Sequence, residues 1–404
     1  MTADSASRPT VDLRSMPPRT APRLGFAPRL AGLYIGLFIF SGIQLPFLPV
    51  WMRAKGIDPA LIGLLVAVPS LVRVAGIPFA AREADRRDEL RLAIVVCAAA
   101  SVFAFVLVGL SAGTLAIFLT YAFASLLYAP VMPLTETYAL KGLSARGRAY
   151  GPVRLWGSAA FIVASFAAGA ALDVLPARHL IWLLVGASGL VALAAITLQP
   201  ISTRAAAAAA PHLARAGLLR DRRLLAVLAA ASLIQGSHAV YYGFSVLQWR
   251  AEGLGGGSIA ALWAIGVLAE IVLFAFSGRL NVSPTTLLTL GAVGGLVRWG
   301  AMALNPPEAL LPFLQILHAL TFGTTYLGAL TYVTRHAPDG QAATAQGHLA
   351  IAQSITMALM SALAGLLYAK FGVAAYTAMA LAAVAGGICA RIAGRPVIMS
   401  VAHD

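Results

Sequence analysis

Charge is scarce in this sequence. Only 11% of its 404 residues are Asp, Glu, Lys or Arg, while 60% are apolar. A water-soluble domain carries about a quarter charged residues, so the composition excludes an ordinary soluble fold and indicates an all-α polytopic membrane protein. Cysteine is also scarce. Cys97 and Cys389 both fall inside apolar segments, and we expect two buried, inert thiols and no disulfide.

The motifs of enzyme chemistry are missing too. The sequence contains no nucleotide-binding glycine loop, no nucleophile elbow and no paired metal ligands. We therefore expect no enzyme activity, no cofactor and no metal. The formal net charge is +14, but the basic residues are spread between apolar segments and form no basic stripe with aromatics. Such a distribution is typical of topology signals, and we expect no nucleic-acid partner.

Long apolar runs are abundant. A membrane-spanning helix needs roughly 20 predominantly apolar residues, and we predict twelve such helices. They cover residues 30–51, 59–80, 92–110, 114–137, 151–173, 179–198, 224–248, 258–279, 284–304, 309–333, 346–369 and 373–393.

Basic residues are distributed unevenly between the predicted helices. With the N-terminus inside, the internal segments hold 21 Lys and Arg residues, the external loops hold 5, and Arg73, Arg154 and Arg298 lie in the membrane. Because basic residues favour the cytoplasmic side, residues 1–29 and 394–404 are predicted cytoplasmic tails. The first tail has no apolar signal-peptide core, so the first helix itself should direct insertion.

The sequence divides into two halves. Residues 53–73 match residues 250–270 at an offset of 197, with seven identities and no gap. Two parallel repeats related by an axis along the membrane normal are typical of one transporter architecture. We predict six-helix bundles at residues 30–198 and 224–393, joined by a cytoplasmic linker at 199–223. Its alanine run between arginines fits either a short interfacial helix or a flexible connection.

Five ionisable residues in the predicted helices are the most informative. Glu136 and Arg154 are 18 residues apart, Arg298 and His318 are 20 apart, and Glu270 stands alone. Because charge in a bilayer is costly, such residues usually face a cavity and mark a substrate or proton path. The sequence therefore indicates a protein that moves a solute across a membrane.

The Glu136 and Arg154 side chains are expected to meet across a helical hairpin. They form either a structural ion pair between two helices or a pair that exchanges partners with substrate. Trp156 lies two residues beyond Arg154. An aromatic ring beside an arginine suits a ligand that carries both a ring and a carboxylate.

Three further residues are candidates in the second half. His318 beside Arg298 can carry a proton under control of a substrate or gradient, or it is a neutral histidine hydrogen-bonded between helices. The same alternatives apply to His238. Tyr241 follows closely and either lines an aromatic-friendly cavity or is ordinary helix packing.

Glu270 falls opposite Arg73 in the internal repeat. The two residues are therefore expected to face each other across the cavity. If Glu270 is shielded from water it is a candidate proton carrier. The alternative is a structural salt bridge to Arg73 or Arg298.

Several motifs resemble the major facilitator superfamily, in particular its proton-symporter branch that includes lactose, nucleoside and phenylpropionate permeases. These motifs are Tyr-Gly-Pro-Val-Arg-Leu-Trp-Gly-Ser at 150–158, His-Ala-Val-Tyr-Tyr-Gly-Phe at 238–244, Leu-Trp-Ala-Ile-Gly-Val-Leu-Ala-Glu at 262–270 and Leu-His-Ala-Leu-Thr-Phe-Gly at 317–323. The last resembles the phenylpropionate permeases most closely. The resemblance covers residues 30–393.

The resemblance implies roles for the embedded residues. Glu136 and Arg154 match a substrate-binding pair, Glu270 matches an acid that also binds substrate, and Arg298 and His318 match residues that couple transport to protons. One position departs from lactose permease, which has an essential acid three residues after the histidine, where this chain has Thr321. The proton carrier must then be another group, and Glu270 and His318 are the candidates.

The loop after the second predicted helix departs as well. Asp85 and Arg86 match the superfamily's usual Asp-Arg pair, but both flanking glycines are replaced. A cytoplasmic gating contact is expected here. The candidate substrate-binding residues are Arg73, Glu136, Arg154, Trp156, His238, Tyr241 and Glu270, the proton-coupling residues are Glu270, Arg298 and His318, and the gating residues are Asp85 and Arg86.

The sequence thus predicts a secondary transporter of the major facilitator fold. Three embedded arginines against two acids favour an anion, and the resemblance favours proton-coupled import of an aromatic carboxylate such as 3-phenylpropionate. The expected partners are a small-molecule substrate, protons and the lipid bilayer, for a monomer in a bacterial inner (plasma) membrane. The alternatives are a sugar or nucleoside symporter, a proton-driven drug exporter, or a membrane receptor that transports nothing.

Overall fold

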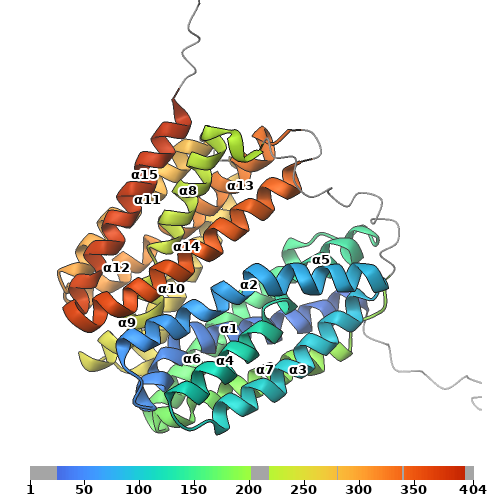
Figure 1. Cartoon of the computed structure of the whole chain (residues 1–404), viewed down its shortest axis with the longest axis horizontal. Helices are drawn as coiled ribbons and strands as arrows, with labels where there is room; N and C mark the ends of the chain where they lie inside the picture. Colours follow the sequence, from blue (N-terminus) through green and yellow to red (C-terminus); the bar gives the residue numbers. More distant parts are fainter. Residues whose placement is uncertain (1–24, 202–217, 280, 339–340, 396–404) are drawn as a thin grey trace, which may run out of the picture.

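The computed structural model describes residues 25–201, 218–279, 281–338 and 341–395. All regular structure within these ranges is helical, as predicted, and none of it is strand (Figure 1). This is the expected result for a chain in hydrocarbon, because a helix satisfies every backbone hydrogen bond within its own segment.

Seven α-helices precede the long connection around residue 210. They are α1 (Phe26–Ala54), α2 (Pro59–Arg87), α3 (Leu90–Leu110), α4 (Thr114–Tyr128), α5 (Val131–Ser144), α6 (Gly151–Val174) and α7 (Leu180–Ile196). Eight follow it, namely α8 (Arg222–Gly236), α9 (Ala239–Ala251), α10 (Gly256–Phe276), α11 (Pro284–Ala303), α12 (Leu311–Ile316), α13 (Thr325–His336), α14 (Ala342–Phe371) and α15 (Tyr376–Gly394).

Capping residues set where several helices begin. Asp58 accepts a hydrogen bond from the N–H of Ala60 at the start of α2, Asp221 accepts two at the start of α8, and Ser283 accepts one at the start of α11. The first helix begins at Phe26, inside the predicted tail of residues 1–29, because apolar side chains from Phe26 onward are buried. The remainder of that tail, to residue 24, lies outside the described residues.

The described ranges contain eleven candidate membrane spans. The last of these, Thr344–Gly394, has 51 residues and contains both α14 and α15. At 1.5 Å per residue it would measure about 76 Å, more than twice the roughly 30 Å of a bilayer core. The chain turns at Gly372, whose φ of 56° suits glycine. Counting α14 and α15 separately gives the twelve predicted helices.

Three spans are interrupted part-way. Pro130 separates α4 from α5, and His238 lies between α8 and α9. His318 stands between α12 and a π-helical turn, Ala319–Thr324, that leads into α13. An interruption of this kind turns side chains onto a new face and is common at functional sites. The buried His238 and the partly buried His318 therefore both lie where a helix is broken.

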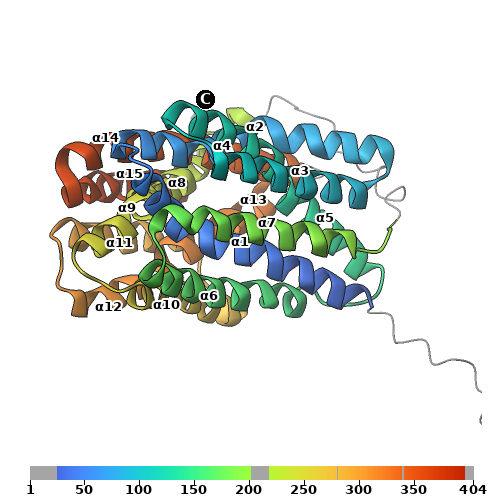
Figure 2. The same cartoon turned by 90° about the horizontal axis from the view of Figure 1, so that it is seen from below.

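The helices pack as two groups, one before and one after the long connection (Figure 1). The main contacts between the groups are α2 with α14 and α6 with α10, and Figure 2 shows α6 beside α10. At each contact two backbones meet directly. A Cβ on Gly63 would overlap the backbone of Gly365, and one on Gly256 would overlap that of Gly169. Residues 202–217 of the predicted linker lie outside the described residues.

Polar contacts between the two groups occur at one end of the molecule. Asp173, near the end of α6, pairs with Arg250 at 2.6 Å and accepts a hydrogen bond from the backbone N–H of Gly256 at 2.9 Å. Gly63 and Gly365 lie toward the same end. We call it the closed end. The opposite end, where α7 finishes and α8 starts, is called the linker end.

Candidate functional site

Two clusters of polar and ionisable side chains lie between the closed end and the linker end. The N-half cluster consists of Tyr34, Glu136, Tyr150 and Arg154. The C-half cluster consists of His238, Glu270, Arg298, Gln315, His318 and Thr321.

In the N-half cluster, Glu136 on α5 meets Arg154 on α6. Arg154 Nε lies 3.5 Å from Glu136 Oε1, and the two side chains are 28% and 30% exposed. The hairpin between α5 and α6 thus brings the pair together, as expected. Neither group is sealed from solvent, so a ligand can reach both.

Two tyrosines complete this cluster. The hydroxyl groups of Tyr34 and Tyr150 donate to the same oxygen of Glu136, Oε2, at 3.0 and 2.5 Å. Sequence reasoning missed both residues. Tyr150 precedes Arg154 by four positions, which places the two on one helical face and was a usable signal. Tyr34 on α1 gave no local signal, because its contact joins residues 102 positions apart.

Arg154 stacks on an aromatic ring, but the ring is not that of Trp156. Its guanidinium carbon lies 4.0 Å from the centre of the Phe38 ring and 5.5 Å from that of Tyr34. Trp156 is 59% exposed and shares an exposed stripe of α6 with Val163. Trp156 points away from Arg154, because residues two apart on a helix point about 200° apart. A contact between Trp156 and a ligand stays a prediction.

In the C-half cluster, Arg298 on α11 is fully buried. It donates to Gln315 Oε1 at 2.6 Å, to Thr321 Oγ1 at 3.2 Å and to His318 Nδ1 at 3.2 Å. Its guanidinium also lies over the rings of Tyr241 and Trp299, at 4.7 and 4.5 Å. Within the described residues, no carboxylate forms an ion pair with Arg298. Neutral acceptors and ring faces hold its charge.

The contact with Arg298 indicates which ring nitrogen of His318 carries the proton. A guanidinium group only donates hydrogen bonds, so Nδ1 of His318 accepts and the ring proton of the neutral histidine sits on Nε2. That nitrogen lies 3.4 Å from Glu270 Oε2. Glu270 therefore ends a chain of polar contacts that begins at Arg298. The predicted approach of Arg298 and His318 is present, and the expected salt bridge of Glu270 to Arg73 or Arg298 is absent from the described contacts.

His238 and Tyr241 are both buried. His238 Nε2 lies 3.0 Å from Thr321 Oγ1, and Nδ1 lies 3.0 Å from the backbone oxygen of Gln235. His238 is therefore a histidine hydrogen-bonded between helices, one of its two predicted alternatives. The ring of Tyr241 stacks on Trp263 at 4.7 Å, so Tyr241 packs the wall behind Arg298 instead of lining an open cavity.

Arg73 does not meet Glu270. Its side chain is exposed, and its charge acts on Tyr121 and Tyr128 of α4. Across the molecule, the cation that acts on Glu270 is Arg154. The exposed Tyr326 on α13 is within electrostatic reach of Glu136, Arg154 and Glu270. The two clusters therefore face each other, through Arg154 and Glu270.

The predicted gating pair lies at the linker end. Arg86 pairs with Glu83 at 2.9 Å on the same helix, and Arg87 pairs with the same carboxylate. Asp85 is exposed and forms no ion pair with a described residue. A gating role for Asp85 and Arg86 stays a prediction.

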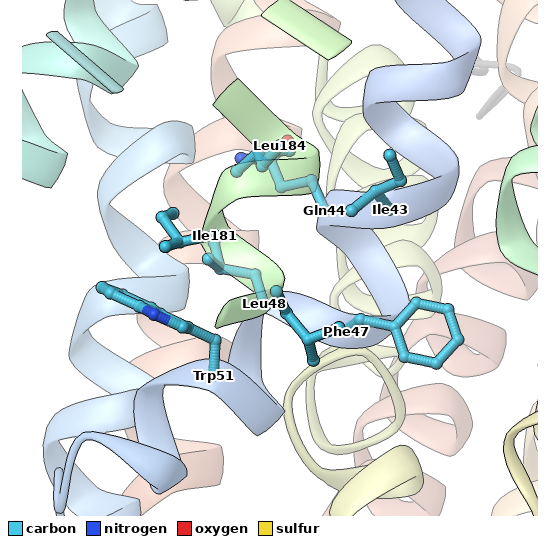
Figure 3. A pocket seen from close by; sticks show the side chains of 8 residues that line it. Ile43, Gln44, Phe47, Leu48, Trp51, Ile181 and Leu184 are labelled. Carbon is cyan, nitrogen blue, oxygen red and sulfur yellow. The ribbon is translucent and has the colours of Figure 1, made fainter. Parts of the chain in front are cut away.

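A small, partly open cavity occurs elsewhere, between α1 and α7 (Figure 3). It is lined by Ile43, Gln44, Phe47, Leu48, Trp51, Leu180, Ile181 and Leu184 and has a volume of about 10 Å³. This is barely enough for one water molecule. The cavity is a packing defect and cannot hold a solute.

Comparison with known proteins supplies the family. The model of the MFS_1 like family matches residues 28–378, which contain both clusters. The chain belongs to the MFS_1 like family. This MFS_1 like chain is 31% identical over 356 residues to a probable 3-phenylpropionic acid transporter of Escherichia coli (strain K12), with 87% of this chain and 93% of the relative covered. It is 28% identical over 319 residues to the maltose permease of Geobacillus stearothermophilus, covering 77% and 80%.

Solved structures agree on the fold. The MFS_1 like chain superposes on the crystal structure of the nucleoside transporter NupG with a TM-score of 0.78 and 17% identity, over 92% of this chain and 98% of that one. A bacterial homologue of the human lysosomal transporter Spinster, in an inward-facing and occupied conformation, gives 0.71 at 15% identity, covering 91% and 96%. The protein is a multi-pass membrane transporter of the major facilitator type, and its relatives are transporters, not enzymes.

Proposed function

We propose that this transporter imports a small aromatic carboxylate, such as 3-phenylpropionate, together with a proton. The observation that carries the proposal is the state of Arg154. Its Nε atom faces Glu136, its guanidinium plane stacks on Phe38, and its terminal nitrogens Nη1 and Nη2 form no hydrogen bond with a described residue. A guanidinium fork with free ends beside an aromatic face fits a carboxylate attached to a ring.

Arg298 then serves the coupling step instead of substrate binding. Its buried guanidinium is already bonded to three side chains, so a ligand would have to displace them. His318 carries only one proton while it accepts from Arg298, and Glu270, the partner of its other nitrogen, is the available proton carrier. Arg154 and Glu270 act on each other, which links anion binding to the charge on the carrier.

The packing supports alternating access by movement of one half against the other. The halves meet through close glycine contacts and an ion pair at the closed end. We place that end outside and the linker end, with both termini, in the cytoplasm of a bacterial cell whose inner membrane holds the transporter as a monomer. Release towards the cytoplasm would then follow from this conformation.

A sugar symporter is the second candidate, favoured by the similarity to maltose permease. An acid and an arginine side by side also suit hydroxyl groups. In that function Glu136 would bind substrate directly and carboxylates would be ignored.

The test uses proteoliposomes loaded with a pH-sensitive dye and, separately, counterflow of labelled 3-phenylpropionate. Counterflow measures exchange without net proton movement, so it detects binding and translocation alone. We expect both signals to exceed those of protein-free liposomes, which correct for the weak acid that crosses bilayers unaided. Counterflow of maltose but not of 3-phenylpropionate would establish the sugar alternative.

A further inference from the structure

Glu136 poses a problem for a site that binds anions. A free carboxylate beside Arg154 would repel an anionic ligand and would compete with it for the guanidinium. Arginine and carboxylate groups favour the bidentate arrangement, in which two N–H groups meet two oxygens. In the structure the pair is not bidentate. One contact of 3.5 Å joins Nε to Oε1, and the described residues leave Nη1 and Nη2 without a hydrogen bond.

The other carboxylate oxygen explains this arrangement. Glu136 Oε2 accepts hydrogen bonds from both Tyr34 and Tyr150. The hydroxyl groups must be the donors, because an ionised carboxylate only accepts. An oxygen has two lone pairs, so Oε2 has no capacity left for Arg154 or for a ligand.

The two tyrosines are also fixed in place. Tyr34 is fully buried on α1, and its ring meets that of Tyr150 edge to face at 6.3 Å. Tyr150 stands immediately before α6, the helix that carries Arg154. The carboxylate is therefore held between α1, α5 and the start of α6, with Oε2 turned to the tyrosines.

We propose that Tyr34 and Tyr150 determine the site's preference for carboxylates, by holding Glu136 away from the terminal nitrogens of Arg154. They act as positioning residues, and the inference rests on the proposed function because it assumes that the ligand's carboxylate binds Arg154. Without the two hydroxyl groups, Glu136 rotates into a bidentate pair with Arg154 and blocks the ligand. The affinity for a neutral ligand, which does not pair with the Arg154 guanidinium, is not affected by this change.

The test is a suppressor experiment on four proteins in proteoliposomes. They are the wild type, Tyr34→Phe/Tyr150→Phe, the same pair with Glu136→Gln added, and Tyr128→Phe. Tyr128 is a matched control, because its buried hydroxyl group makes no hydrogen bond with a described residue. Monodispersity in size-exclusion chromatography confirms that each is folded, and the single variant Tyr150→Phe replaces the pair if the pair fails this check. Counterflow of 3-phenylpropionate gives KM and Vmax, and competition by 3-phenylpropionamide measures neutral ligand binding.

We expect the double variant to raise KM for the acid roughly tenfold, as for loss of one charge-assisted hydrogen bond. Vmax and competition by the amide should stay near wild type. Adding Glu136→Gln should restore a low KM, because a neutral amide forms no ion pair with Arg154. A normal KM in the double variant, or a raised KM that Glu136→Gln does not lower, would overturn the inference. A wild type that transports no carboxylate would instead refute the proposed function.

Discussion

Arg154 and Arg298 are both membrane-embedded arginines with a titratable neighbour, yet their surroundings differ in two respects. Each guanidinium has two aromatic rings beside it, but Arg154 is 28% exposed with one weak ionic contact, whereas Arg298 is fully buried and donates to three side chains. A ligand can bind the Arg154 guanidinium without displacing a hydrogen-bond partner. To bind Arg298 it would have to displace the side chains that already accept from that guanidinium.

Embedded charge alone therefore does not identify a ligand site. Both arginines stand out equally in the sequence, and both would be costly in lipid. What separates them is which of their donors are already occupied. We therefore assign substrate binding to the half whose arginine has free terminal nitrogens, and coupling to the half whose arginine already donates to three side chains.

The largest effect is expected for Arg154→Ala. Losing a two-bond contact to a carboxylate costs about 3 kcal/mol, which is roughly a hundredfold in KM for 3-phenylpropionate counterflow. Arg154→Lys keeps the charge but not the fork and should recover only part of the loss. Unchanged uptake in both variants would remove Arg154 from the substrate site.

A large effect on stability, not on ligand recognition, is expected for Arg298→Leu. The change leaves Gln315, His318 and Thr321 without their shared donor, and it should lower the free energy of unfolding by about 2 kcal/mol. Thermal unfolding in detergent would measure this. The matched variant Arg154→Leu loses one exposed ionic contact and should cost about 1 kcal/mol or less. Equal destabilisation by the two changes would show that Arg298 contributes no more to stability than Arg154 does.

Glu270→Gln should separate proton movement from exchange. The amide is close in size to the carboxyl group but cannot carry a proton, so substrate-induced dye acidification should fall roughly tenfold. Counterflow should remain near wild type, because exchange needs no net proton transfer. His318→Gln is the companion variant. If His318 only passes protons to Glu270, His318→Gln should reduce acidification less than Glu270→Gln does. Counterflow abolished by Glu270→Gln would show that Glu270 binds substrate.

The smallest effect is expected for Trp156→Ala. Because Trp156 lies on an exposed stripe of α6, KM for 3-phenylpropionate should stay within about twofold of wild type. Phe38→Ala is the contrasting change, since it removes the ring on which Arg154 stacks, and it should raise KM several-fold. A larger rise in KM for Trp156→Ala than for Phe38→Ala would show that Trp156, as the sequence predicts, contacts the ring of the ligand.

Much of the fold could be predicted from the sequence, because apolar runs and caps determine where membrane helices lie. The approach of Glu136 to Arg154 and of Arg298 to His318 followed from short connections between neighbouring helices. Contacts between residues far apart in the chain could not be predicted in this way. Tyr34 reaches Glu136 across 102 positions, and Phe38 lies under Arg154 because Gly157 leaves room for its ring. The break at His318 and the π-helical turn after it were equally hidden, since nothing in Leu-His-Ala-Leu-Thr-Phe-Gly marks a change of helical period.

The two contacts between the halves have a consequence for how the molecule moves. The 197-residue offset of the repeat places Pro59 opposite Gly256 and Lys370 opposite Asp173. At the α6–α10 contact the Gly256 N–H and Arg250 bind Asp173, whereas Pro59 has no N–H and Lys370 is no acceptor. In the part of the chain that the structure describes, no hydrogen bond or ion pair joins α2 to α14. The duplicated contacts have thus diverged. The α2–α14 contact joins the halves by packing alone, whereas the α6–α10 contact adds the polar contacts of Asp173, which would have to break if the closed end opened.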